Sequence, residues 1–216
     1  MRIAPFLMYL ALAQTVDACE LPVCLVDPQS LALTRIITFE EAQSSFGPGY
    51  QVKGLLILEG ARFGELFAGQ NLLQQGDHDQ VEGDPLSPLT LLAGDPNAGL
   101  SIVRMSGNNV LNGYGASGFP KREAQGEGAI AWLFDDDQAA LSFQVRGGEG
   151  GQGQASFFRR DGSLISTMDL SPLAEHELGF IRQGEVNDIA GVILTNIDPE
   201  GVALDNLRFG RPPDIS

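Results

Sequence analysis

The sequence predicts an all-β fold, and three observations support this class. Glycine and proline are frequent, at 27 and 12 of 216 residues. Helical periodicity is hard to find, and short runs of alternating apolar and polar residues recur between turn residues. This combination is typical of an antiparallel sandwich or barrel, and the length suits one domain with a single sizeable core.

The predicted strands run through the whole chain. The first is LTRIITFE at 33–40, one or two more lie in 53–67, and 88–94 with 99–105 are expected to form a hairpin around DPNA. The second half contributes 128–134 and 139–147 around the turn DDDQ, a hairpin within 155–167, and strands at 177–183, 188–196 and 202–209.

Local patterns support several of these strands. Within 139–147 apolar residues alternate with polar ones, as in a half-buried strand. Asp161 and Gly162 provide the positive backbone angle that a tight hairpin turn needs. Trp132 alternates with other large apolar residues, so we expect it in the core.

Three stretches do not alternate in this way. Residues 74–88 are acidic, and 106–128 are long and rich in glycine, so both are expected to be loops. GGEGGQGQ at 147–154 lacks the ending of a phosphate-binding loop and is interpreted as a flexible strand connection.

The N-terminus resembles an export signal. Arg2 precedes an apolar run at 3–13, which is too short to span a membrane, and small residues follow. We expect a signal peptide at 1–18, with cleavage after Ala18 or, alternatively, after Ala13. Residues 19–34 would then be a leader, 35–210 the β-sandwich domain and 211–216 a tail.

Cys19 and Cys24 fit an exported chain, because they would close a small disulfide loop in an oxidising compartment. Two free thiols, or a lipid anchor on Cys19, are the alternatives. The net charge of -15 argues against a nucleic-acid partner and is compatible with calcium, which binds oxygen ligands.

Asp205 raises a question of burial. In GVALDNLRF, strict alternation places Ala203 and Asp205 on the same face as Leu207 and Phe209, toward the core. A carboxylate buried there needs a cation or several hydrogen-bond donors.

The order of short motifs carries a resemblance. ITFEEA, GARF, GAIAWLFDDDQAALSF, FFRRDGSL and ALDNLRF follow one another along the chain. This order resembles the jelly-roll β-sandwich domains of exported bacterial surface proteins, many with Pro-Glu-Pro (PEP-CTERM-type) sorting tails. More distantly, it resembles carbohydrate-binding modules. The resemblance covers about residues 35–210 and implies an antiparallel, galactose-binding-like jelly roll that is secreted or periplasmic.

The resemblance also implies a structural Ca²⁺ where the first and last strands meet. Carried over to this chain, the ligands would be Glu40 or Glu41 together with Asp205. The alternative is that Asp205 accepts backbone N–H groups from a neighbouring loop or a bond from an arginine.

Sugar recognition needs an exposed aromatic ring with polar neighbours. Tyr114, flanked by glycines within 106–128, is the best candidate. Its polar neighbours in the sequence are Asn109, Asn112, Lys121 and Arg122.

We expect no catalytic residues. His78 and His176 lie apart, no G-x-S-x-G motif is present, and His78 is more simply part of a solvated acidic loop. The sequence therefore predicts an exported, non-catalytic binding module with a carbohydrate ligand and no membrane span. The alternative is a structural or adhesive surface protein that binds another protein.

Overall fold

The computed structural model describes residues 20–96 and 99–211. The predicted signal peptide, Cys19 and most of the predicted tail lie outside these residues. The predicted disulfide of Cys24 with Cys19 therefore stays a prediction. No helix in the described part of the chain has the length and apolar character needed to cross a membrane.

The described residues form strands joined by turns and three short 3₁₀ segments, η1 (Pro28–Leu31), η2 (Arg122–Ala124) and η3 (Gln183–Glu185). The strands of the first half are β1 (Val23–Val26), β2 (Arg35–Ile37), β3 (Tyr50–Gln51), β4 (Leu56–Leu58), β5 (Ala61–Gly64), β6 (Leu66–Phe67), β7 (Asn71–Gln75), β8 (His78–Glu82), β9 (Leu91–Leu92), β10 (Leu100–Arg104) and β11 (Asn109–Gly113). Those of the second half are β12 (Ile130–Gln138), β13 (Ala140–Gly147), β14 (Gln152–Phe158), β15 (Leu164–Asp169), β16 (Glu177–Arg182), β17 (Ile189–Ile197) and β18 (Val202–Phe209).

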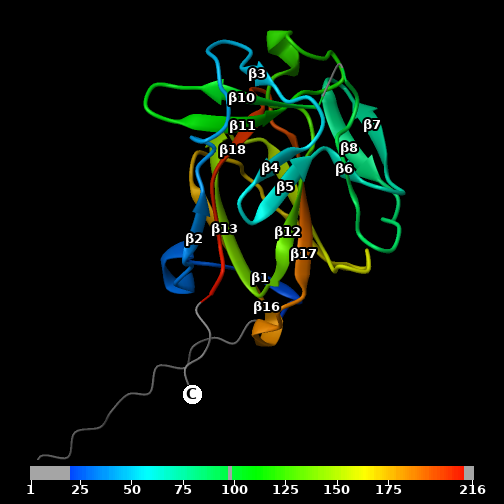
Figure 1. Cartoon of the computed structure of the whole chain (residues 1–216), viewed down its shortest axis with the longest axis vertical. Coiled ribbons are helices and arrows are strands. Elements are labelled where there is room, and N and C mark those ends of the chain that lie inside the picture. Colours follow the sequence, from blue (N-terminus) through cyan, green and yellow to red (C-terminus); the bar gives the residue numbers. More distant parts are fainter. Residues whose placement is uncertain (1–19, 97–98, 212–216) are drawn as a thin grey trace, which may run out of the picture.

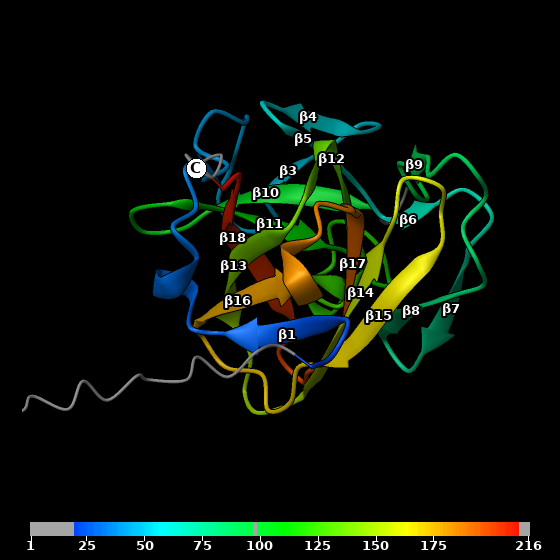
Figure 2. The same cartoon turned by 90° about the horizontal axis from the view of Figure 1, so that it is seen from below.

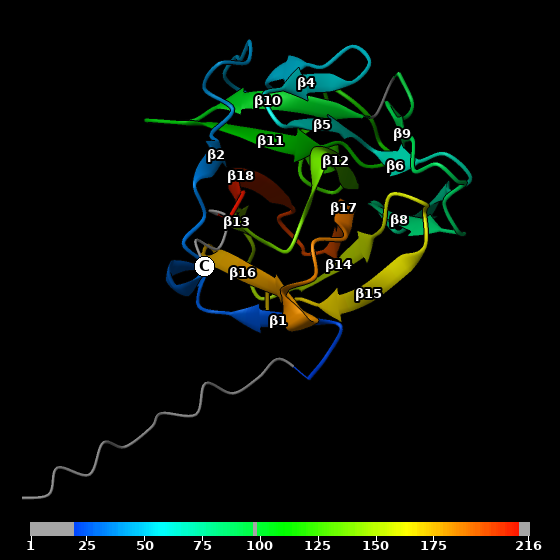
Figure 3. The ribbon, with the colours of Figure 1, turned by 60° about the horizontal axis from the view of Figure 1, so that its bottom comes forward.

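Two antiparallel sheets pack face to face, which confirms the predicted all-β sandwich (Figure 1). Sheet A has eight strands in the order β1-β16-β13-β18-β11-β10-β3, with β2 also paired to β18. Sheet B has six strands in the order β15-β14-β17-β12-β5-β4. Figure 3 shows both sheets around the shared core. The jelly-roll subtype stays a prediction.

The core follows from strand alternation. On β13, Leu141, Phe143 and Val145 are fully buried, as the sequence predicts for a half-buried strand. Trp132 of β12 is also fully buried and meets Phe143 edge-on, with ring centroids 5.6 Å apart. Aromatic rings from both sheets thus fill the interior.

The first and last predicted strands lie side by side. Ile37 of β2 is opposite Leu207 of β18, and Arg35 is opposite Phe209. Phe39, just after β2, belongs to the same buried cluster as Phe209. The expected pairing of these two strands is therefore confirmed.

A β-bulge in β18 corrects the expected orientation of Asp205. Against β13, Arg208 is opposite Ser142 but Asp205 is opposite Gln144, so β18 contains one extra residue. Asn206 takes the positive φ of 47° that this bulge requires. The bulge reverses the alternation: Leu204 and Leu207 both face the core, and Asp205 faces the outer side of sheet A.

The structure corrects the predicted start of the domain. The leader at 19–34 is not separate from the sandwich, because β1 pairs with β16 and Val23 is fully buried. Residues 20–34 are therefore part of the folded domain.

The predicted hairpin around DPNA and the predicted turn at DDDQ are also wrong, because the strands concerned pair elsewhere in the fold. β9 pairs with β6, whereas β10 pairs with β11 and β3. DDDQ belongs to β12, which lies in the opposite sheet from β13. The hairpin in 155–167 is confirmed as β14–β15, with Gly162 at a φ of 88°.

The two predicted loops contain strands. Residues 74–88 include β8, which forms a separate hairpin with β7, and 106–128 include β11. The predicted connection 147–154 includes the start of β14. Polar and glycine-rich strands of this kind lack the apolar alternation that identifies a strand in sequence.

We predict that Asn206→Val will lower the free energy of unfolding by about 2 kcal/mol. A β-branched residue is strained at the positive φ of this position. The substitution also removes the hydrogen bond from Asn206 Nδ2 to Gln144 Oε1 (2.8 Å). Urea unfolding would measure this free energy. Arg208→Val, at a neighbouring position of the same strand, should change it by less than about 0.5 kcal/mol. Equal losses for the two variants would contradict the bulge.

Candidate functional site

Asp205 finds hydrogen-bond donors at the seam of β2 and β18. Asp205 is 2% exposed. Asn108 Nδ2 donates to Asp205 Oδ2 at 2.6 Å, and the backbone N–H of Asn206 donates to Asp205 Oδ1 at 2.8 Å. Burial raises the pKa of this carboxyl, and the nearby charge of Glu40 adds to the rise. Asp205 is thus hydrogen-bonded as the alternative interpretation required, but its donors are a side-chain amide and the N–H of the next residue rather than loop N–H groups or an arginine.

The predicted calcium ligands do not form a cluster. Glu40 Oε1 accepts the backbone N–H of Asn109 at 2.7 Å, and Glu41 is exposed to solvent. The described residues contain no group of three or more His, Cys, Asp or Glu side chains able to hold a metal. The structural calcium therefore stays a prediction without support from this geometry.

Tyr114 is buried, which corrects its expected exposure. Its hydroxyl donates to the carbonyl of Pro48 at 2.7 Å, and its ring meets Phe119 edge-on at 5.2 Å. Burial raises its pKa to about 12. The ring therefore cannot stack on a sugar. Asn109 is likewise buried, and its side-chain amide donates to the carbonyl of Phe39 at 3.2 Å.

Two of the predicted ligand residues line a groove on the outer face of sheet A. Asn112 and Arg122 contribute to this groove, which has a volume of about 580 Å³ and is here called the sheet-A groove. Asn109, Tyr114 and Lys121 do not line it. Its floor is a small apolar cluster, Val103, Val110 and Ala203. Its sides carry charges of both signs: Arg122, Glu123, Glu127, Arg146 and Glu200.

A second groove is almost wholly uncharged and was not predicted. It has a volume of about 460 Å³ and lies between β14, β15, β17 and the β7–β8 hairpin. Figure 2 shows this hairpin beside β14 and β15. We call it the glutamine groove, after the four glutamines among its residues: Gln75, Gln80, Gln152, Gly153, Gln154, Asp169, Ser171, Thr195, Asn196 and Ile197.

Strand alternation places two of these glutamines. Ala155 and Phe157 of β14 are in the core, so Gln152 and Gln154 face outward from sheet B. Gln154 is opposite Thr195 of β17 on one side and Asp169 of β15 on the other. The signal in the sequence is the alternation of Gln with small residues in GQGQAS, which overlaps the predicted connection 147–154.

The groove has unused hydrogen-bonding capacity. Gln154 Nε2 donates to Asp169 Oδ1 at 3.2 Å, and Gln80 Nε2 donates to the carbonyl of Asn196 at 3.4 Å. The side-chain amides of Gln75 and Gln152 make no hydrogen bond to any residue in 20–96 or 99–211. Each amide offers donors and an acceptor. The groove is thus suited to a neutral ligand with many hydroxyl groups.

Exposed aromatic side chains lie elsewhere. Phe46 is 69% exposed, and the guanidinium of Arg104 lies 5.7 Å from its ring centroid. Tyr50, on strand β3 at the edge of sheet A, is 41% exposed. Neither residue lines the sheet-A groove or the glutamine groove.

Three acidic groups at or near the β7–β8 hairpin have raised pKa values: Asp79 on β8, Glu65 between β5 and β6, and Glu127 before β12. Burial, with a smaller contribution from the charge of Asp79, raises the pKa of Glu65 to about 8. Burial raises that of Asp79 to about 6 and that of Glu127 to about 7. His78 is half-buried on β8 rather than in a solvated loop, and burial lowers its pKa. His176 is exposed, as expected.

Two predictions concern these residues. Tyr114→Phe should destabilise the fold by about 1 kcal/mol through loss of the bond to Pro48, and leave ligand binding unchanged. Urea unfolding and a binding titration would measure both quantities. A loss of binding without a loss of stability would restore Tyr114 as a ligand residue.

The raised carboxyl pKa values predict that stability falls with rising pH. Burial moves the pKa of Glu65 from 4.5 to about 8, so between these values the folded state keeps a proton that the unfolded chain has lost. The contribution of Glu65 to the free energy of unfolding is therefore largest below pH about 4.5, and it decreases as the pH rises to about 8. We expect Tm to fall by roughly 10 °C across this interval. Glu65→Gln should flatten the decrease, and a flat wild-type profile would contradict the prediction.

Comparison with known proteins gives little further information. No family model matches the chain, and no curated protein matches it. Among solved structures, it is similar to the CBM22-1–GH10 modules of a Clostridium thermocellum endo-1,4-β-D-xylanase, solved with xylohexaose. The identity is 11% and the TM-score 0.32, and the match covers 55% of this chain and only 25% of that one. A match this weak carries no argument, so the resemblance to exported jelly-roll domains and to carbohydrate-binding modules stays a prediction.

Proposed function

We propose that this chain is a non-catalytic module that binds a neutral polysaccharide in the glutamine groove. The observation that carries the proposal is the lining of that groove. Four glutamines, an asparagine, a threonine and a serine are accompanied by a single carboxylate, Asp169. Hydroxyl groups both donate and accept hydrogen bonds, and amide side chains satisfy both functions.

We expect an extended ligand to lie along this groove. The groove runs over the outward faces of β14 and β17, and the β7–β8 hairpin forms one wall. Its volume of about 460 Å³ lies within the usual range of ligand sites. Without an aromatic platform, most of the binding free energy must come from hydrogen bonds exchanged with water. We therefore expect a weak Kd, of about 0.1–1 mM.

The carboxyl groups favour binding over hydrolysis. Glycoside hydrolysis uses two carboxyl groups on either side of the scissile bond. Asp169 is the single carboxylate in the glutamine groove, and Glu65 and Asp79 are buried outside it. Export of the chain, as the N-terminal sequence predicts, would bring such a module into contact with external polysaccharides.

We predict that Gln152→Ala combined with Gln154→Ala will weaken binding at least tenfold, because several hydrogen bonds of about 1 kcal/mol each are lost. Calorimetric titration with neutral hexasaccharides of glucose, xylose and mannose would measure this. Gln43→Ala, at an exposed glutamine outside the groove, is the matched control. The proposal fails if the wild type binds no member of the panel, or if the double variant binds as well as the control.

One observation favours a protein partner as the second candidate. β4 lies at the edge of sheet B, and its Ile57 is 70% exposed. An exposed apolar edge strand can add a strand from another chain. If no sugar binds, loss of partner binding or self-association in Ile57→Lys would support this alternative, and unchanged behaviour would exclude it.

A further inference from the structure

Glu65 and Asp79 form a buried pair of carboxyl groups outside the glutamine groove. Glu65, between β5 and β6, is 0% exposed, and Asp79, on β8, is 4% exposed. The two carboxyl groups contact each other. Glu65 Oε1 and Asp79 Oδ2 have no hydrogen-bond donor among the described residues.

The backbone holds each carboxyl group in place. The N–H groups of Asp95 and Gly99 bond to the carboxylate of Glu65, with Asp95 N 3.1 Å from Oε2. The N–H of Ala129 bonds to the carboxylate of Asp79. Gly94 leaves room for this arrangement, since a Cβ there would lie 1.6 Å from Glu65 Oε2. The two groups cannot move apart without breaking these bonds.

The charged groups around the pair are acidic. Among the described residues, the charge of Asp95 contributes to the raised pKa of Glu65. The charges of Asp77, Asp79 and Glu123 likewise contribute to the raised pKa of Glu127. Burial lowers the pKa of His78, next to Asp79 on β8, and the charges of Asp77 and Asp198 oppose this shift. Two ionised carboxylates in contact repel strongly when buried, so such a pair ordinarily retains one proton between them.

A bound calcium explains the pair less well. Calcium takes six to eight oxygen ligands. This pair leaves two carboxylate oxygens without donors, and no metal-binding cluster exists in the described chain. A proton satisfies both oxygens at once, because it turns one acceptor into a donor.

The pair has a direct connection to the glutamine groove. β7 and β8 pair only with each other among the described strands, and a two-stranded hairpin alone is marginal in water. Asp79 is adjacent to Gln80, whose amide reaches the carbonyl of Asn196. The N–H of Asp79 also bonds to the carbonyl of Glu127 at 3.0 Å. Asp79 therefore lies where the hairpin is attached to the sandwich.

We propose that Glu65 and Asp79 share one proton, and that this hydrogen bond positions the β7–β8 hairpin so that Gln75 and Gln80 complete the glutamine groove. Loss of the proton at alkaline pH releases the hairpin and weakens binding. Both residues are positioning residues, because neither reaches the ligand. The effect on binding rests on the proposed function, whereas the shared proton and the attachment of the hairpin do not.

The raised pKa of Glu65, about 8, sets the range in which this release occurs. Below that pH the pair holds its proton and the hairpin is attached. Above it both carboxyl groups ionise, and their repulsion favours detachment. Binding should thus be constant from pH 6 to 7 and fall at least fivefold by pH 9.5.

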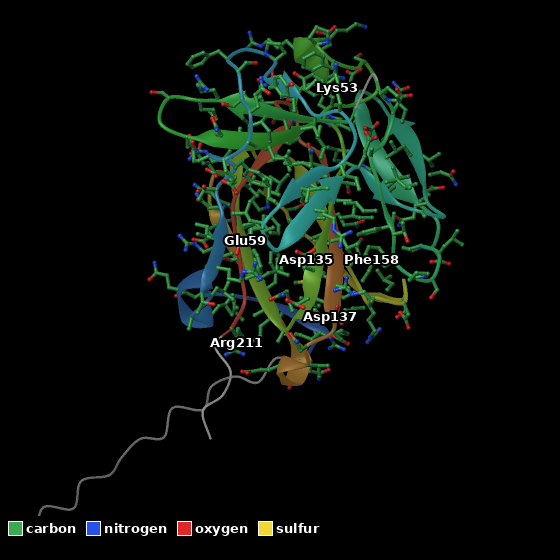
Figure 4. All side chains as sticks on the ribbon, in the orientation of Figure 1. Lys53, Glu59, Asp135, Asp137, Phe158 and Arg211 are labelled. Atoms are coloured by element: carbon green, nitrogen blue, oxygen red, sulfur yellow. The ribbon has the colours of Figure 1, made fainter. Side chains whose placement is uncertain are left out.

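Hydrogen exchange of residues 71–82 tests the structural part without any ligand. After correction for the intrinsic rate, exchange of this segment in the full chain should rise at least tenfold from pH 6 to 9.5, relative to β14. Glu65→Gln keeps the shape and donates an N–H to Asp79, so its profile should be flat. Glu59→Gln, at a 98% exposed side chain in the turn between β4 and β5 (Figure 4), should behave as the wild type.

Asp79→Asn provides a second variant if Glu65→Gln does not fold, and it should also give a flat profile. Flat exchange in the wild type would overturn the inference. Release of the hairpin by EDTA at pH 6 would also overturn it, since a metal would then hold the pair.

Titration with the hexasaccharide that binds in the panel tests the connection to the groove. The wild type should lose affinity at alkaline pH and Glu65→Gln should not. Hairpin release with no sugar bound at any pH would refute the proposed function and leave the shared proton supported. Sugar binding that is independent of pH, despite hairpin release, would refute the positioning role alone.

Discussion

Strand β18 is the element on which the sandwich depends, because it pairs with three strands at once. Its N-terminal half pairs with β11, its C-terminal half with β2, and β13 runs along its other edge. These pairs join the two ends of the described chain within one sheet. The bulge at Asn206 separates the two halves and lets Leu204 and Leu207 both enter the core. It also turns Asp205 outward, toward the donor on Asn108.

Within residues 20–96 and 99–211, several buried carboxyl groups make no salt bridge, among them Glu65, Asp79, Asp198 and Asp205. Two solutions recur in the structure. Asp205 and Asp198 accept hydrogen bonds from backbone N–H groups, and for Asp198 these come from Glu149, Gly151 and Glu200. Glu65 and Asp79 instead lie against each other. Hydrogen bonds from backbone N–H groups favour the charged form of a carboxyl group, whereas contact between two carboxyl groups disfavours it, because the low local dielectric strengthens repulsion between like charges.

The surface separates charged from neutral regions. Arginines pair with acids at several places, including Arg160 with Asp137 at 2.6 Å and Arg62 with Asp135 at 3.3 Å, where both acids lie on β12 (Figure 4). The glutamine groove is neutral apart from Asp169, although the whole chain carries -15. A neutral groove in so acidic a protein favours ligands without charge, since anions would be repelled and cations would bind elsewhere.

The sequence alone determined the all-β class, most strands of the second half, the β14–β15 turn at Gly162 and the burial of Trp132. These features follow from alternation and turn chemistry, which are local. Only the tertiary structure decided the bulge in β18, the burial of Tyr114, the pairing of Glu65 with Asp79 and the glutamine groove. Each of these four features depends on contacts between segments that are distant in sequence. The residue pattern of one strand does not indicate which other segment will pack against that strand. Strict alternation even gave the wrong face for Asp205, because one extra residue in a strand reverses every side chain beyond it.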